Sequence, residues 1–144
     1  MNIWTLDLLA TMGITPTNVM QMAFGAMTAA LFLQSGLDKL FNWKGEKAYL
    51  TGHFEKSILR GMVPIAMPLI TLLELGAGSL SAVGFFQILF VHSTGIGLLC
   101  MVLAVKALFL LFLGQRIAKD YAGAASLVPY FLMCAAGLYF FMAG

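Results

Sequence analysis

The stretch PLITLLELGAGSL, residues 68–80, places one acidic residue, Glu74, at the centre of a run of apolar and small residues. It lies inside a longer apolar segment, residues 62–86, which exceeds the length of about 20 residues that a helix needs to cross a bilayer. A carboxyl group in such a segment is costly unless it is protonated, paired or used. The fold therefore depends on whether the whole chain has the composition of a membrane protein.

The composition of the chain is that of an integral membrane protein. Of its 144 residues, 61% are hydrophobic and 10% are charged, whereas soluble domains are about 45–50% apolar and about 25% charged. Residues 19–41, 62–86, 95–113 and 123–141 are each apolar enough to form a span. Their apolar residues are continuous rather than alternating, which favours helices over the strands of a barrel. We predict an all-α fold, a single four-helix transmembrane bundle covering residues 1–144.

Basic residues gather on one side of the predicted topology. Of the eight Lys and Arg residues, all except Lys106 flank or occupy the connections between spans 1 and 2 and between spans 3 and 4. They are Lys39, Lys44, Lys47, Lys56, Arg60, Arg116 and Lys119. Because loops that stay in the cytoplasm are enriched in Lys and Arg, we predict that both connections are cytoplasmic and that both termini lie outside.

Two segments outside the spans are predicted to lie on the membrane surface. Residues 3–12 are short and apolar and include Trp4, a residue type that favours the headgroup region, so we expect an interfacial N-terminal segment. In residues 42–60, aromatic and aliphatic side chains alternate with charges at helical spacing, which is typical of an amphipathic helix on the cytoplasmic surface. Docking of this helix on a partner is the alternative. His53 within it is interpreted as a surface histidine.

Four polar residues inside the spans are candidates for ligand binding or proton relay: Glu74, Lys106, Gln34 and Asp38. At a rise of 1.5 Å per residue, Glu74 lies about 18 Å from the predicted cytoplasmic end of its span, and Lys106 and Gln34 each lie about 10 Å from theirs. We expect Glu74 to face the bundle and to meet Lys106, Gln34 or a bound polar group. The alternatives are a buried pair that sets helix register, a proton or headgroup site, and a protonated Glu74 with Lys106 extended to the interface.

Small residues predict which helix faces pack together. Glu74 belongs to a stripe with the spacing i, i+3, i+7 and i+10, and two small residues in the first span are four positions apart. Small residues let membrane helices approach closely, so these faces are expected to point into the bundle. The helix-packing candidates are Thr71, Gly78, Ser81, Gly25 and Ala29.

The sequence contains no nucleotide-binding, catalytic-triad or metal-binding motif. The predicted topology places His53 and His92 on opposite sides of the membrane, which excludes a haem held between them. Cys100 and Cys134 are interpreted as small buried residues. We expect no catalytic residue, metal or cofactor of the chain's own and no nucleic-acid partner. A quinone or lipid at a shared site remains an option.

Two short motifs resemble those of the DoxX-like family of small bacterial membrane proteins. The residues that carry the resemblance are Gly36, Asp38, Lys39 and Leu40 in GLDKL, and Glu74, Gly76 and Gly78 in ELGAG. An arginine that family members often carry early in the first helix is absent from VMQMAFG. The resemblance implies a four-helix protein of the bacterial inner membrane linked to redox complexes, as in the membrane subunit of a thiosulfate:quinone oxidoreductase.

Three functions are consistent with these observations. The first is a non-catalytic accessory subunit of a larger respiratory or quinone-linked membrane complex. The second is a quinone- or lipid-binding protein in which Glu74 and Lys106 hold a headgroup or relay its proton. The third is a small-solute or lipid transporter, which would need a homo-oligomer because four helices are too few for most alternating-access mechanisms. In each case the lipid bilayer is the immediate partner.

Overall fold

The computed structural model describes residues 3–144, and these residues form helices joined by short connections. The helices are α1 (Ile3–Thr11), α2 (Pro16–Phe41), α3 (Trp43–His53), α4 (Val63–Val91), α5 (Gly95–Ile117) and α6 (Tyr121–Ala143). The prediction of an all-α fold is therefore confirmed for this part of the chain.

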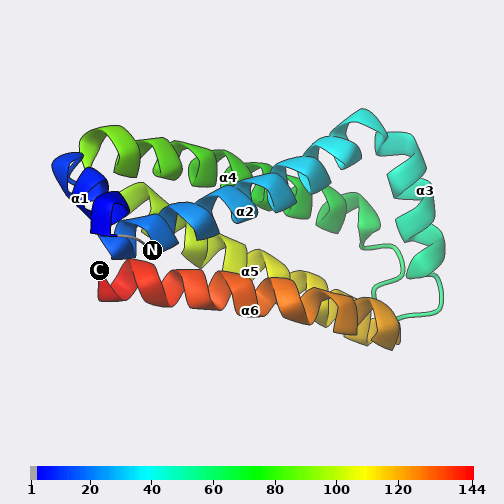
Figure 1. Ribbon diagram of the computed structural model, residues 1–144. Helices are drawn as coiled ribbons and strands as arrows, with labels where there is room; N and C mark the ends of the chain where they lie inside the picture. Colours follow the sequence, from blue (N-terminus) through cyan, green and yellow to red (C-terminus); the bar gives the residue numbers. More distant parts are fainter. Residues whose placement is uncertain (1–2) are drawn as a thin grey trace.

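The four long helices run side by side (Figure 1). α2 packs on α4, α4 on α5 and α5 on α6, and α6 returns to contact α2. The short helices lie at opposite ends of this arrangement. α1 is at the end that also holds the C-terminus, here called the α1 end, whereas α3 lies with the α5–α6 connection at the other, the α3 end.

Three of the long helices, α4, α5 and α6, are long and apolar enough to cross a membrane, as expected of a membrane protein. α2 has 26 residues, but polar residues such as Gln21 and Gln34 make it less apolar than the other three. α4 and α5 extend to Val91 and Ile117, beyond the predicted span ends at residues 86 and 113. Hydropathy detects only the apolar part, whereas helical hydrogen bonding continues past it because each further residue adds a bond.

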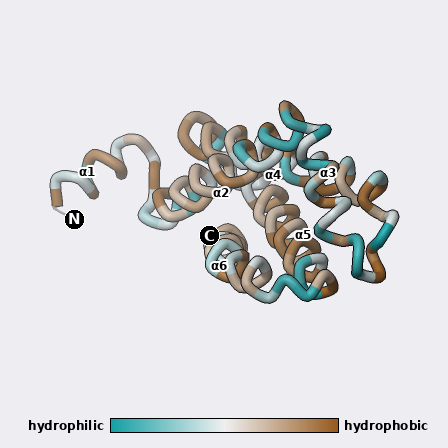
Figure 2. Tube along the Cα trace, turned by 90° about the vertical axis from the view of Figure 1, so that its right-hand side faces the viewer, coloured by the Kyte–Doolittle hydropathy of each residue, from teal (hydrophilic) through white to brown (hydrophobic). Residues whose placement is uncertain are grey.

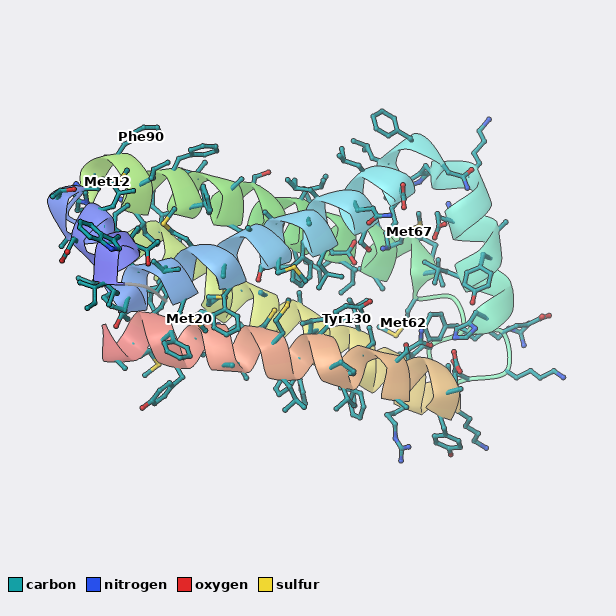
Figure 3. All side chains as sticks on the ribbon, in the orientation of Figure 1. Met12, Met20, Met62, Met67, Phe90 and Tyr130 are labelled. Carbon is teal, nitrogen blue, oxygen red and sulfur yellow. The ribbon has the colours of Figure 1, made fainter. Side chains whose placement is uncertain are left out.

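The outer faces of the long helices carry large apolar side chains that no part of the described chain covers. Phe90 on α4 is 73% exposed and points away from the helices in Figure 3. Exposed residues of the same kind include Ile65, Leu69, Leu72, Leu99, Phe109, Leu132 and Met142. Soluble monomers rarely expose continuous apolar surface of this extent. A bilayer or another protein must therefore cover these faces.

Small residues bring α2, α4 and α5 close together. A Cβ atom at Gly78 would lie 2.8 Å from the backbone nitrogen of Leu33 on α2, and one at Gly84 would lie 2.9 Å from the Cα atom of Gly97 on α5. Neither position has room for a larger residue without a shift of backbone. Close backbone approach of this kind increases van der Waals contact between helices in a membrane.

The packing candidates lie mainly in these contacts. Ser81 on α4 donates a 2.9 Å hydrogen bond to the backbone carbonyl of Gly25 on α2. Thr71 is buried and donates at 2.8 Å to the carbonyl of Met67, one turn earlier in its own helix. Gly25 and Gly78 are buried, whereas Ala29 is half-buried.

Candidate functional site

Glu74 lies in a cluster of three polar side chains at the interface of α2 and α4. Its side chain is 2% exposed, and the ammonium nitrogen of Lys39 lies 2.9 Å from its Oε2 atom and 3.1 Å from its Oε1 atom. The Ser35 hydroxyl donates to Oε1 at 2.9 Å. Lys39 also donates to the Ser35 oxygen at 2.9 Å. The three side chains therefore form one closed network, here called the Lys39 cluster.

The direction of the Lys39 side chain follows from helix geometry. Lys39 lies two residues before the end of α2 at Phe41. Side chains on a helix lean toward its N-terminus, so the ammonium group extends back along α2 to Ser35, one turn earlier. α4 is within reach because Gly36 has no side chain there, and a Cβ atom would lie 2.7 Å from Leu75. Lys39 is thus turned into the protein, with 15% of its side chain exposed.

Some hydrogen-bonding groups of the Lys39 cluster have no well-placed partner. An ammonium group has three donors. Two of them serve Ser35 Oγ and Glu74 Oε1, and the third reaches only the Ser35 carbonyl at 3.5 Å, which is long for a hydrogen bond. Oε2 of Glu74 accepts no hydrogen bond from the described residues. Its 2.9 Å approach to Lys39 is a charge contact without hydrogen-bond direction, since the ammonium donates to Oε1 instead.

The cluster is neutral overall because Lys39 and Glu74 compensate each other. Removing one member of a buried ion pair leaves the other charge uncompensated and costs about 3–5 kcal/mol, whereas replacing both with neutral groups is often tolerated. The arrangement can hold α2 and α4 in register. It also places a cation at a point where the surroundings are otherwise apolar.

Glu74 is buried, as expected, but the expectation that Lys106 or Gln34 is its protein partner was wrong, because Lys39 and Ser35 occupy that place. Gln34, Asp38 and Lys106 are exposed, and none of them has a hydrogen bond or ion pair with Glu74. At about 100° per residue, Gln34 and Asp38 lie about 180° and about 140° around α2 from the buried Gly25. They therefore point away from α4.

The sequence does contain a signal for the true partner. Gly25, Phe32 and Lys39 are spaced by seven residues, so they share one face of α2. Gly25 and Phe32 are both buried, and Ser35 lies one turn before Lys39 on the neighbouring position of that face. From the sequence, Lys39 is one of the basic residues that indicate orientation and a member of the GLDKL motif, but it is not among the partners predicted for Glu74. Continuing the small-residue stripe along α2 includes Lys39 on the inward face, but it does not set the depth of Lys39 against α4.

A cavity adjoins the Lys39 cluster at the α3 end. Its volume is about 290 Å³, and α2, α3, the turn after α3, α4 and α5 all contribute to its wall. The polar residues on this wall are Lys39 and Gln115, and the remaining lining is apolar apart from Gly114. Met62 and Met67, labelled in Figure 3, form part of the wall at the start of α4.

His53 connects α3 to the rest of the protein at this cavity. Its Nε2 atom lies 2.7 Å from Gln115 Oε1 and 3.5 Å from Asp120 Oδ2. Its ring stacks on Tyr49 at 5.6 Å and meets Phe54 edge to face at 5.1 Å. The interpretation of His53 as a surface histidine is therefore wrong, because its side chain is only 17% exposed and contacts Gln115 near the end of α5 and Asp120 in the α5–α6 connection.

The described residues contain no group of three or more His, Cys, Asp or Glu side chains able to hold a metal ion. Cys100 and Cys134 are buried free thiols. His92, at the opposite end, lies against Gly13, where a Cβ atom would be 3.2 Å from the ring.

Comparison of this chain with protein-family models, curated proteins and solved structures gives no match.

Proposed function

We propose that the chain is a four-span integral membrane protein in which α2 is the fourth span beside α4, α5 and α6. Three observations support this proposal. Figure 2 shows α1 projecting sideways from the end of the long helices, as a helix lying on a membrane surface would, and it shows hydrophilic residues concentrated at α3 and the α5–α6 connection. Trp4 on α1 is 82% exposed, consistent with a position among lipid headgroups.

The proposed orientation has the α3 end in the cytoplasm and the α1 end outside. All basic residues except Lys106 belong to the α3 end or the segments that lead to it. This distribution is the one that the positive-inside rule requires. The membrane is proposed to be the inner membrane of a bacterium, in agreement with the resemblance to the DoxX-like family.

The function that we propose is that of an accessory subunit of a larger membrane complex, and Lys106 is the observation that carries it. Lys106 is eleven residues from Gly95 and eleven from Ile117, so it lies at the centre of α5. It is exposed and has no hydrogen bond or ion pair with any residue between 3 and 144. α5 continues past the apolar part of its span, which ends at residue 113, so Lys106 keeps the expected depth of about 10 Å from that end.

A lysine at this position is poorly suited to lipid. A depth of about 10 Å is farther than a stem of four methylene groups extends, so the ammonium group would remain inside the hydrocarbon. Charged residues inside membranes therefore pair with one another or face protein. We infer that another protein covers this face of α5 and supplies an acidic or acceptor group to Lys106.

The covering protein is proposed to differ from this chain. A second copy would need an exposed carboxylate at the same depth. Among the acidic residues of the long helices, Glu74 is buried in the Lys39 cluster and Asp38 lies three residues from the end of α2. Counted from the predicted span ends at residues 41 and 113, Asp38 is about 6 Å closer to the α3 end than Lys106. A homo-oligomer therefore gives Lys106 no exposed carboxylate at its own depth.

Co-purification combined with a charge substitution tests the proposal. Native mass spectrometry of the protein extracted in mild detergent should show a stoichiometric complex with a different membrane subunit. Lys106→Leu should abolish that complex, whereas Lys119→Leu, which removes a lysine in the α5–α6 connection, should leave it intact. A lone chain, a homo-oligomer or a complex that survives Lys106→Leu would contradict the proposal.

The respiratory or quinone-linked character of the complex rests on the resemblance alone, and the cofactors of the purified complex would test it. A role as quinone- or lipid-binding protein is favoured by one further observation, the apolar cavity beside Lys39. The transporter hypothesis stays a prediction from the sequence.

A further inference from the structure

We propose that the cavity at the α3 end binds an uncharged apolar molecule whose carbonyl-type oxygen accepts a hydrogen bond from Lys39. This site is independent of the proposed subunit contact at Lys106. Its ligand class follows from three properties of the cavity: its lining, its charge and its free hydrogen-bond donors.

The lining requires a ligand that is mainly hydrocarbon. Aliphatic and aromatic side chains make up nearly all of the wall, including Leu50, Phe54, Met67 and Ile70. A volume of about 290 Å³ is at the lower limit of small-molecule sites, which are typically about 300–1,000 Å³. The cavity therefore suits one chain or one ring system of modest size rather than a whole two-chain phospholipid.

The charge of the site selects against anions. Lys39 is the one charged residue on the described wall of the cavity, and its charge is already compensated by Glu74 at 2.9 Å. An anionic headgroup at Lys39 would lie near the Glu74 carboxylate in a poorly solvated region, where like charges repel strongly. If the anion displaced Glu74, it would leave that carboxylate buried and unpaired. A neutral ligand creates neither problem.

The free polar groups on the wall are donors. Lys39 has one N–H group engaged only at 3.5 Å, with the Ser35 carbonyl. Gln115 accepts a hydrogen bond at its Oε1 atom from His53 Nε2, while its amide NH₂ group has no hydrogen bond to any residue of the described chain. Donors without acceptors call for a ligand with acceptor oxygens. A ketone, ester or similar carbonyl compound meets this requirement without adding charge.

Two matched photoreactive probes distinguish the ligand classes. One is methyl decanoate and the other is decanesulfonate, each with a diazirine at the same chain position, applied to the full chain in nanodiscs. Labelling is located by peptide mass spectrometry on the residues of the cavity wall. In the wild-type protein, we expect labelling of the wall by the ester to exceed labelling by the sulfonate by at least about tenfold, because an uncompensated buried charge is strongly unfavourable.

Three variants assign that preference to the ion pair. Glu74→Gln keeps the shape of the side chain but leaves Lys39 uncompensated, so sulfonate labelling should rise at least about tenfold and reverse the preference. Asp38→Asn removes the same charge from an exposed position on α2 and should change neither probe. The double variant Lys39→Met/Glu74→Gln has no charge at the site. It should lose ester labelling without gaining sulfonate labelling.

The outcomes distinguish failure of the ligand site from failure of the proposed subunit contact at Lys106. Equal labelling by both probes in the wild-type protein, or a preference for the sulfonate, overturns the inference even if Glu74→Gln does not fold. Absence of wall labelling by either probe also overturns it, and shows that the cavity is not a ligand site at all. Neither result affects the subunit contact at Lys106, which is measured separately.

Discussion

Lys39 and Glu74, 35 residues apart in the sequence, form an ion pair that joins the last turn of α2 to the middle of α4, with 2.9 Å between Lys39 Nζ and Glu74 Oε2. Its members belong to the two short motifs on which the resemblance to the DoxX-like family rests. The pair joins two helices, and through Lys39 it places a compensated cation on the wall of an apolar cavity.

Loss of one member of this pair should destabilise the protein more than loss of both. Lys39→Met leaves Glu74 buried and unpaired, and we expect the free energy of unfolding to fall by about 3–5 kcal/mol. The double variant Lys39→Met/Glu74→Gln should recover most of that loss. Thermal unfolding in detergent measures both, with Asp38→Asn as the control. A double variant no more stable than Lys39→Met would contradict the predicted recovery.

Two glycines of α4 should respond in opposite ways to substitution. Gly78→Ala places a methyl group 2.8 Å from the Leu33 backbone nitrogen, so α2 and α4 must separate and the protein should lose about 1–3 kcal/mol of stability. Gly76 has no atom within 4 Å of an added Cβ. Gly76→Ala should therefore raise stability by about 0.5–1 kcal/mol, because alanine favours a helix over glycine. Unfolding midpoints of the two variants provide the comparison, and equal shifts would argue against the close contact.

His53→Ala should loosen α3 from the rest of the protein. The substitution removes the contacts of His53 with Gln115 and Asp120, and a typical hydrogen bond contributes about 0.5–1.5 kcal/mol. Hydrogen–deuterium exchange should increase in residues 43–62 and remain unchanged in α6. Lys56→Ala, an exposed position in the same segment, is the matched control. If exchange in residues 43–62 does not change, His53 is not an anchor of α3.

The orientation can be tested with single cysteines and a membrane-impermeant thiol reagent in intact cells. The native thiols Cys100 and Cys134 are 0% exposed, so they should not react. Thr11→Cys, at the α1 end, should be labelled from outside, whereas Lys44→Cys, at the α3 end, should react only after the membrane is permeabilised. The reverse pattern would invert the proposed topology, and labelling of both in intact cells would exclude it.

Features that depend on local composition and periodicity were predictable from the sequence. Continuous apolar segments without alternation specify helices, since each helix satisfies its own backbone hydrogen bonds. The position of Glu74 on a small-residue face of α4 followed from the spacing of Thr71, Gly78 and Ser81. Helix ends were less accurate because hydropathy marks the apolar part of a helix and not its last hydrogen bond.

The partner of Glu74 and the cavity were decided only by the tertiary structure. A change of one residue turns a side chain by about 100° around its helix, so two neighbouring polar stripes on α2, one with Gln34 and Asp38 and one with Ser35 and Lys39, fit the sequence almost equally well. The contact of Gly36 with Leu75 and of Gly78 with Leu33 sets the rotation and depth of α2 against α4. That packing turns Lys39 inward, leaves Gln34 outside, and creates a cavity whose wall comes from segments far apart in the sequence.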